Sequence, residues 1–172
     1  MDFNILESMN EEELKNYTQF ILWHYRVVDS FWFISVSKMF DQATAERINE
    51  NVWGRISGMA AEKIVELFDI RVKGLKGFIQ ALKYFPWYIL LGFDIEENDE
   101  SVIITVTSCP PQEARLRRGL KEYVCKTMHK RAFEDFAKAI DPHIQVECIF
   151  APPDPHPEGI FCKWCIKLEV PQ

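Results

Sequence analysis

Hydrophobic side chains recur at helical spacing along the first third of the chain. Asn10 and Glu13 form the pattern of a capping box, which predicts that a helix begins just after Asn10. One apolar row then follows every three or four positions, at Leu14, Tyr17, Ile21, Tyr25, Val28, Trp32 and Met39. A second row lies beside it, at Phe20, His24, Val27 and Phe31. Two rows predict a helix that is covered on most sides and central in the fold.

Two further helices are predicted before residue 86. Asp41 is placed to cap a helix that runs to about Phe68, and Gly54 and Gly58 lie four residues apart within it. Because glycine weakens a helix interior, this pair predicts close approach of another helix. A shorter helix is predicted from about 75 to 84, with Pro86 ending it.

Two charged residues interrupt the apolar rows of the first helix. Arg26 and Asp29 are three positions apart and can meet on one helix face. One interpretation is a half-buried ion pair that fixes the helix in place. The other is that Asp29 or His24 points into a ligand cavity.

The chain changes character near residue 86, where alternating patterns predict strands. Four are predicted, at 87–95, 102–106, 144–150 and 160–168, with helices at about 112–120 and 130–140. The predicted fold is therefore α+β, with N-terminal helices packed on a four-stranded antiparallel sheet in the order ααα-ββ-α-ββ. We expect one domain over residues 1–172, with a helical half at 1–85 and a sheet-containing half at 86–172.

Composition excludes several classes of protein. Of the 172 residues, 48% are hydrophobic, which excludes wholesale disorder. A net charge of −6 argues against nucleic acid as the partner. No 18-residue stretch lacks charge and no secretory signal is visible, so we expect a cytoplasmic protein with no membrane span and with reduced thiols.

Cysteine is the residue type with the clearest chemical potential. If Cys109, Cys125, Cys148 and Cys162 converge in the fold, their thiolates form a tetrahedral zinc site. The alternative is that they are ordinary core thiols and that no cofactor binds, since their spacing lacks the close ligand pairs of structural zinc sites. Cys162 and Cys165 are three apart in a predicted strand, so their sulfurs diverge and no redox motif is expected.

Two other segments carry candidate site residues. The proline-rich loop 152–157 presents Asp154 and His156, which with Cys109 form a candidate nucleophilic set; Cys125 and Cys148 are alternative nucleophiles. Arg115 and Arg118 are three apart on one predicted helix face and can hold a substrate carboxylate. The alternatives are a rigid surface loop and a solvated basic helix face.

Four segments carry a family resemblance: 109–115, 139–142, 152–157 and 162–164. With Asp29, Trp32 and Trp53, they resemble an uncharacterised prokaryotic family of putative cytosolic proteins. That family is distantly similar to L-2-amino-thiazoline-4-carboxylate hydrolases and, more remotely, to vinyl-reductase-like domains. The resemblance implies an α+β fold, a pocket for a hydrophobic ligand and zinc-binding cysteines, with Cys109, Cys125, Cys148, Cys162 and His156 as the residues that carry over.

Three functions follow from these patterns. The first is a protein that binds a small molecule or a metal ion through a cysteine-rich site. The second is a hydrolase that opens a cyclic C–N or C–S compound such as a thiazoline carboxylate, with a cysteine as nucleophile. The third is a ligand sensor or scaffold without chemistry, forming a homodimer through its aromatic helices.

Overall fold

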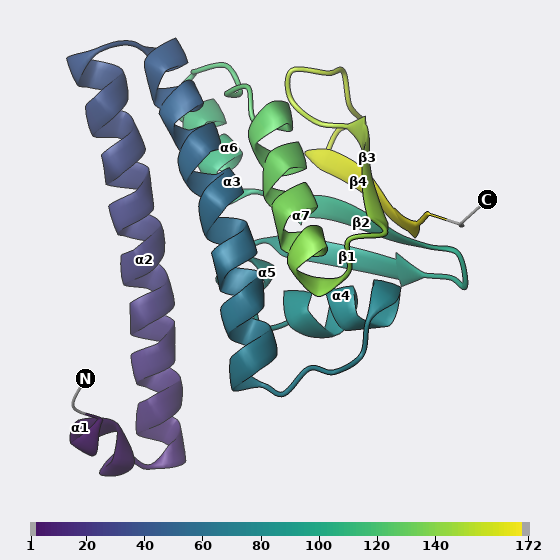
Figure 1. Ribbon diagram of the computed structural model, residues 1–172. Coiled ribbons are helices and arrows are strands. Elements are labelled where there is room, and N and C mark those ends of the chain that lie inside the picture. The colour runs from purple at the N-terminus through teal and green to yellow at the C-terminus, as the bar shows by residue number, and fades with distance from the viewer. Residues whose placement is uncertain (1–2, 170–172) are drawn as a thin grey trace.

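The computed structural model describes residues 3–169 and has the predicted α+β architecture (Figure 1). The elements, in chain order, are α1 (Asn4–Glu7), α2 (Glu11–Met39), α3 (Gln42–Leu67), α4 (Gly74–Leu82), α5 (Pro86–Leu90), β1 (Gly92–Glu97), β2 (Ser101–Ser108), α6 (Pro110–Leu116), α7 (Lys126–Ile140), β3 (Ile144–Phe150) and β4 (Cys162–Leu168). Residues 1, 2 and 170–172 of the predicted domain lie outside the described range. Within that range, none of the helices has both the length and the apolar character required to span a membrane.

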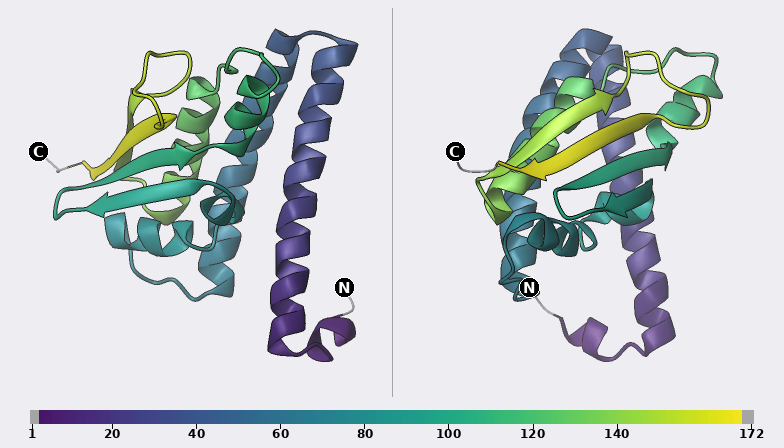
Figure 2. Two further views of the ribbon diagram at one scale, coloured as in Figure 1. Left: turned by 180° about the vertical axis from the view of Figure 1, so that it is seen from behind. Right: turned by 90° about the vertical axis from the view of Figure 1, so that its right-hand side faces the viewer.

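One antiparallel sheet holds all four strands, in the order β1-β2-β4-β3. The predicted alternation of β4 is confirmed, since Cys162, Trp164 and Ile166 are buried while the residues between them are partly exposed. Helix α7 lies between the sheet and α3, and α2 lies outside α3 (Figures 1 and 2). The main core therefore forms where α4, α7 and the sheet meet.

Local signals placed the two long helices correctly. The side chain of Asn10 accepts a hydrogen bond from the backbone N–H of Glu13 at 3.0 Å, and the Glu13 carboxylate accepts one from the N–H of Asn10 at 2.9 Å. Asp41 caps α3 by accepting from the N–H of Thr44 at 2.6 Å. The close approach predicted at the two glycines of α3 is confirmed, because a Cβ atom on Gly58 would lie 3.3 Å from the carbonyl oxygen of Asp135 on α7.

The central position predicted for the first helix is wrong. Only Val36 of α2 is buried, and Figure 1 shows α2 as the outermost element of the helical layer. Phe20, Phe31 and Trp32 are each more than half exposed. The two apolar rows predicted a helix that is covered on most sides. However, no other element of the described chain packs on the outer face of α2.

Smaller differences concern where elements begin and end. The strand predicted from Trp87 begins at Gly92, because Pro86 starts the short helix α5. The helix predicted at 112–120 is α6, which begins at Pro110 and ends at Leu116, and α7 begins four residues earlier than predicted, at Lys126. Proline is favoured in the first turn of a helix, and both displaced starts at 86 and 110 use it in that role.

Candidate functional site

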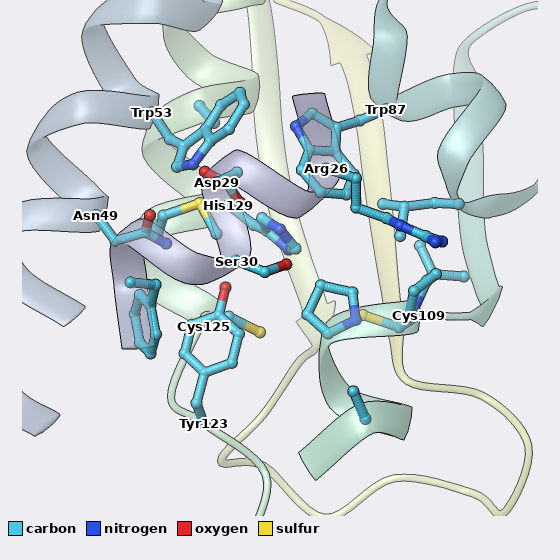
Figure 3. Close-up of a pocket in the computed structure, with 18 of the residues that line it drawn as sticks. Arg26, Asp29, Ser30, Asn49, Trp53, Trp87, Cys109, Tyr123, Cys125 and His129 are labelled. Carbon is cyan, nitrogen blue, oxygen red and sulfur yellow. The ribbon is translucent and has the colours of Figure 1, made fainter. Parts of the chain in front are cut away.

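A cavity of about 660 Å³ lies between the helical layer and the sheet (Figure 3). Residues of α2, α3, α5, α6, α7, β1 and β2 contribute to its wall. Much of the wall is apolar and aromatic, including Phe33, Phe85, Trp87, Leu91, Phe93 and Phe136. The volume and the apolar wall are those of a small-molecule site.

Three aromatic rings join the helices at one side of the cavity. The rings of Trp53 and Trp87 meet edge to face with centroids 5.7 Å apart. Tyr25 of α2 lies 6.1 Å from Trp53 and 6.0 Å from Trp87. Burial raises the pKa of the Tyr25 hydroxyl to about 12, so it is un-ionised at neutral pH. This cluster fixes α2 against α3 and α5 and therefore helps to hold the cavity open.

Asp29 contributes a carboxylate to the cavity wall, and it is the one acidic side chain among the described residues that line it. Burial raises its pKa, and a hydrogen bond from the Trp53 side chain partly offsets that effect. The described residues contain no ion pair between Asp29 and Arg26, so the half-buried pair considered above is not formed. Asp29 instead lines the cavity, as the second interpretation predicted. His24 does not, because it stacks on Phe20 outside the cavity.

Basic side chains line the same cavity in larger number. In the described chain they are Arg26, Lys38, Arg115, Arg117 and Arg118. The structure thus places both predicted arginines, Arg115 and Arg118, at the cavity. Arg115 donates to the carbonyl oxygen of Lys121 at 2.8 Å, and Arg117 lies 3.6 Å from Glu113, whereas Arg26 and Arg118 form no ion pair within residues 3–169. The spacing of Arg26 and Asp29 indicated an ion pair between them, and no pattern in the sequence indicated that Arg26 lines this cavity.

Two further polar groups face the cavity without a described partner. Ser57 is only 1% exposed, and its hydroxyl forms no hydrogen bond within residues 3–169. His129 packs edge to face against Phe133 and Trp164, with centroids 6.5 and 6.4 Å away. Burial lowers the pKa of His129 to about 4, so its imidazole is neutral at pH 7 and can donate or accept a hydrogen bond.

The structure brings three of the four predicted zinc ligands, but not all four, to the cavity wall. Cys109, Cys125 and Cys162 line the cavity, whereas Cys148 is outside it. Burial raises the pKa of Cys109 to about 11 and that of Cys162 to about 12, and it raises the pKa of Cys125 further still, so all three are neutral thiols at pH 7. Between residues 3 and 169, no group of three or more His, Cys, Asp or Glu residues could hold a metal ion. The predicted zinc site therefore has no geometric support.

The proline loop forms different pairs from those in the predicted catalytic set. Nε2 of His156 lies 3.0 Å from a carboxylate oxygen of Glu122, and this contact raises the pKa of His156. Asp154 instead binds the Lys126 ammonium at 2.7 Å and accepts a hydrogen bond from the N–H of Ala151. No hydrogen bond joins Cys109, His156 and Asp154 in the part of the chain described here, so the structure does not assemble this set.

Comparison with known protein families identifies the family of this chain. A family model described as "Family of unknown function (DUF6125)" matches residues 8–168. The chain belongs to this family. A search among curated proteins found no significant match. The match spans every residue that lines the cavity, and it supports the uncharacterised family that the sequence motifs resemble.

A buried glutamine organises one wall of the cavity in this family member. Gln112 of α6 is fully buried, and its amide nitrogen donates to the carbonyl oxygen of Tyr123 at 3.0 Å and to the sulfur of Cys125 at 3.4 Å. Its amide oxygen accepts from the N–H of Tyr123, also at 3.0 Å. Gln112 therefore holds the segment that brings Tyr123 and Cys125 to the cavity, a role that no sequence pattern indicated.

Proposed function

We propose that this protein binds a small molecule with an apolar body and an anionic group, most simply a carboxylate, in the 660 Å³ cavity. The observation that carries the proposal is the combination of aromatic walls with basic side chains at one cavity. In the described residues, one carboxylate and five basic groups line it, although the whole chain has a net charge of −6. Such an excess of positive charge in an acidic protein favours an anionic ligand.

The lining residues divide into two kinds of contact. Trp53, Trp87 and the phenylalanines supply flat apolar surface for the body of the ligand. The guanidinium groups of Arg26 and Arg118, which have no acidic partner in residues 3–169, are available to the anionic group. The hydroxyl of Ser57 lacks a partner among the residues that the structure describes, and a buried hydroxyl of this kind is stabilised when a ligand supplies one.

Octanoate and 1-octanol, two probes with the same chain length, test the anionic part of the proposal. We expect octanoate to bind more tightly in calorimetric titrations. In the double variant Arg26→Gln/Arg118→Gln, octanoate should bind at least 10-fold to 100-fold more weakly, because the loss of even one charged hydrogen bond costs about 1.5–3 kcal/mol. Binding of 1-octanol should change less than about twofold by the same reasoning.

Arg47→Gln/Arg71→Gln is the matched control, since both of these arginines are exposed and neither lines the cavity. It should bind octanoate as the unmodified protein does. Equal losses in the two double variants would mean that only overall charge matters, and failure of both probes to bind would reject the proposed ligand class.

Asp29→Asn should strengthen octanoate binding severalfold at pH 7. The substitution removes the one acidic group that lines the cavity in the described chain, while the amide oxygen can still accept from Trp53. Because burial raises the pKa of Asp29, the ionised carboxylate lowers the stability of the folded state at neutral pH, so the variant should also melt at a higher temperature. Differential scanning calorimetry with and without octanoate measures both effects; weaker octanoate binding would contradict the assigned role.

Hydrolysis of a cyclic C–N or C–S compound such as a thiazoline carboxylate is a second hypothesis. The arginines at the cavity favour it as far as carboxylate binding is concerned. Its nucleophile is less well supported, because the raised pKa values of Cys109, Cys125 and Cys162 keep these thiols protonated at pH 7. Zinc binding likewise stays a prediction. We therefore propose ligand binding as the function of the cavity.

A further inference from the structure

The outer face of α2 carries a regular apolar seam. Its members recur with alternating spacings of three and four residues: Leu14, Tyr17, Ile21, His24, Val28 and Phe31. Phe20 and Trp32 flank the seam on its two sides. This is the heptad spacing of positions a and d in a coiled coil, which normally contact a second helix.

Nothing in the described chain covers this seam. Val28 is 49% exposed, Phe31 is 65% exposed and the flanking Trp32 is 57% exposed. The opposite side of α2 carries Asp29, Phe33 and Val36, which face α3 and the cavity. An amphipathic surface helix has one apolar face, whereas α2 has a second, uncovered one. Phe31 of the seam also lines the ligand cavity, and Val28 and Trp32 border a groove against α3, so the free face adjoins the ligand site.

We propose that α2 pairs with α2 of a second copy of this chain, antiparallel, along this seam. Charge decides between the two possible directions. Glu11, Glu12 and Glu13 lie at the beginning of the helix, and Lys38 lies at its end. A parallel pair would place the glutamates against their own copies, whereas an antiparallel pair places them beside Lys38 of the other copy and also opposes the helix dipoles.

An antiparallel register centred between His24 and Val28 gives apolar layers. It places Ile21 opposite Phe31 and His24 opposite Val28 of the second copy, and the helices then overlap over their full length. Val52, Ile56 and Met59 of α3 are also about half exposed and extend the apolar surface beside the seam. The faces of α2 and α3 on one copy, each about 40 Å long and about 10 Å wide, together present roughly 800 Å², the area that each partner contributes to a standard stable interface.

Sedimentation analysis of the full chain tests the pairing. We expect a dimer at micromolar concentration, and a monomer for Ile21→Glu/Phe31→Glu, with at least a 100-fold weaker association. Trp23→Glu is the matched control: Trp23 is 51% exposed on the same helix but lies off the seam, and its variant should remain dimeric. A wild-type monomer at 100 micromolar, or a seam variant that stays dimeric, would overturn the proposal; a monomer would leave a different protein or a lipid surface to cover the seam.

Two further measurements keep the outcome decisive. Circular dichroism and thermal melting of the seam variant report whether it folds, and the single variant Val28→Lys replaces it if it does not. Lys38→Glu tests the direction, because it should weaken an antiparallel dimer about tenfold at low salt and less at high salt. In a parallel dimer Lys38 lies beside its own copy, so Lys38→Glu exchanges one like-charge pair for another; an unchanged dimer affinity would therefore reject the antiparallel arrangement.

Discussion

Replacing Gln112 with leucine should lower the free energy of unfolding by about 3 kcal/mol. The substitution keeps the side-chain volume but removes both partners of the Tyr123 backbone, whose N–H and carbonyl oxygen each bond the Gln112 amide at 3.0 Å. A buried backbone group without a partner costs about 1–3 kcal/mol, and the Cys125 sulfur loses its donor as well. For a chain of this length, the melting temperature should fall by roughly 6–12 °C.

The same variant should weaken octanoate binding, because Tyr123 and Cys125 reach the cavity from the segment that Gln112 holds. Gln145→Leu is the control: Gln145 is exposed on β3, so its variant should differ from the unmodified protein by no more than about 0.5 kcal/mol. Urea unfolding monitored by tryptophan fluorescence gives the free energy of unfolding of each variant. Equal effects of the two substitutions would show that the buried amide does not organise this wall.

Acid should destabilise the protein through His129. Its pKa is about 4 in the folded state because burial disfavours the charged ring, while an unfolded histidine has a pKa of about 6.5. The folded state therefore binds fewer protons, so stability is complete above pH 6.5 and is lost as the pH falls toward 4. The loss should reach about 2–3 kcal/mol near pH 4. We expect His129→Gln to abolish this part of the acid sensitivity.

Carboxylates also titrate in this range, so the quantity to measure is the difference between the variant and the unmodified protein. Urea unfolding at pH 7 and pH 4 gives that difference for each protein. Gln145→Leu again serves as the control, since the exposed side chain of Gln145 carries no titratable group. If His129→Gln and the unmodified protein lose the same free energy between pH 7 and pH 4, then His129 is not held neutral by burial.

Much of the fold could be predicted from short-range patterns. The capping residues Asn10 and Asp41, the two glycines of α3 and the alternation of β4 each describe interactions between near neighbours or a backbone that needs close contact. The predicted boundaries near Pro86 and Pro110 differ from the observed ones, because proline can both end one element and begin another.

The candidate site was predicted only in part. Arg115 and Arg118 were predicted as a candidate carboxylate clamp, with a solvated basic face as the alternative, and the structure places both at the cavity. The pairing of His156 with Glu122 could not be predicted, since the two residues are 34 positions apart and belong to different loops. Gln112 carried no signal either, because a lone glutamine in a short helix usually faces solvent.

The sequence by itself determined the α+β class, the start of each long helix, the alternating strands and an acidic chain with a few clustered arginines. Only the tertiary structure decided that α2 lies outermost, that three of the four thiols line the cavity while Cys148 does not, and that aromatic and basic residues share one cavity. Periodicity and caps act over one or two helical turns, so they can be seen in the sequence. A cavity depends on how segments up to about a hundred residues apart pack, and no local pattern encodes that arrangement.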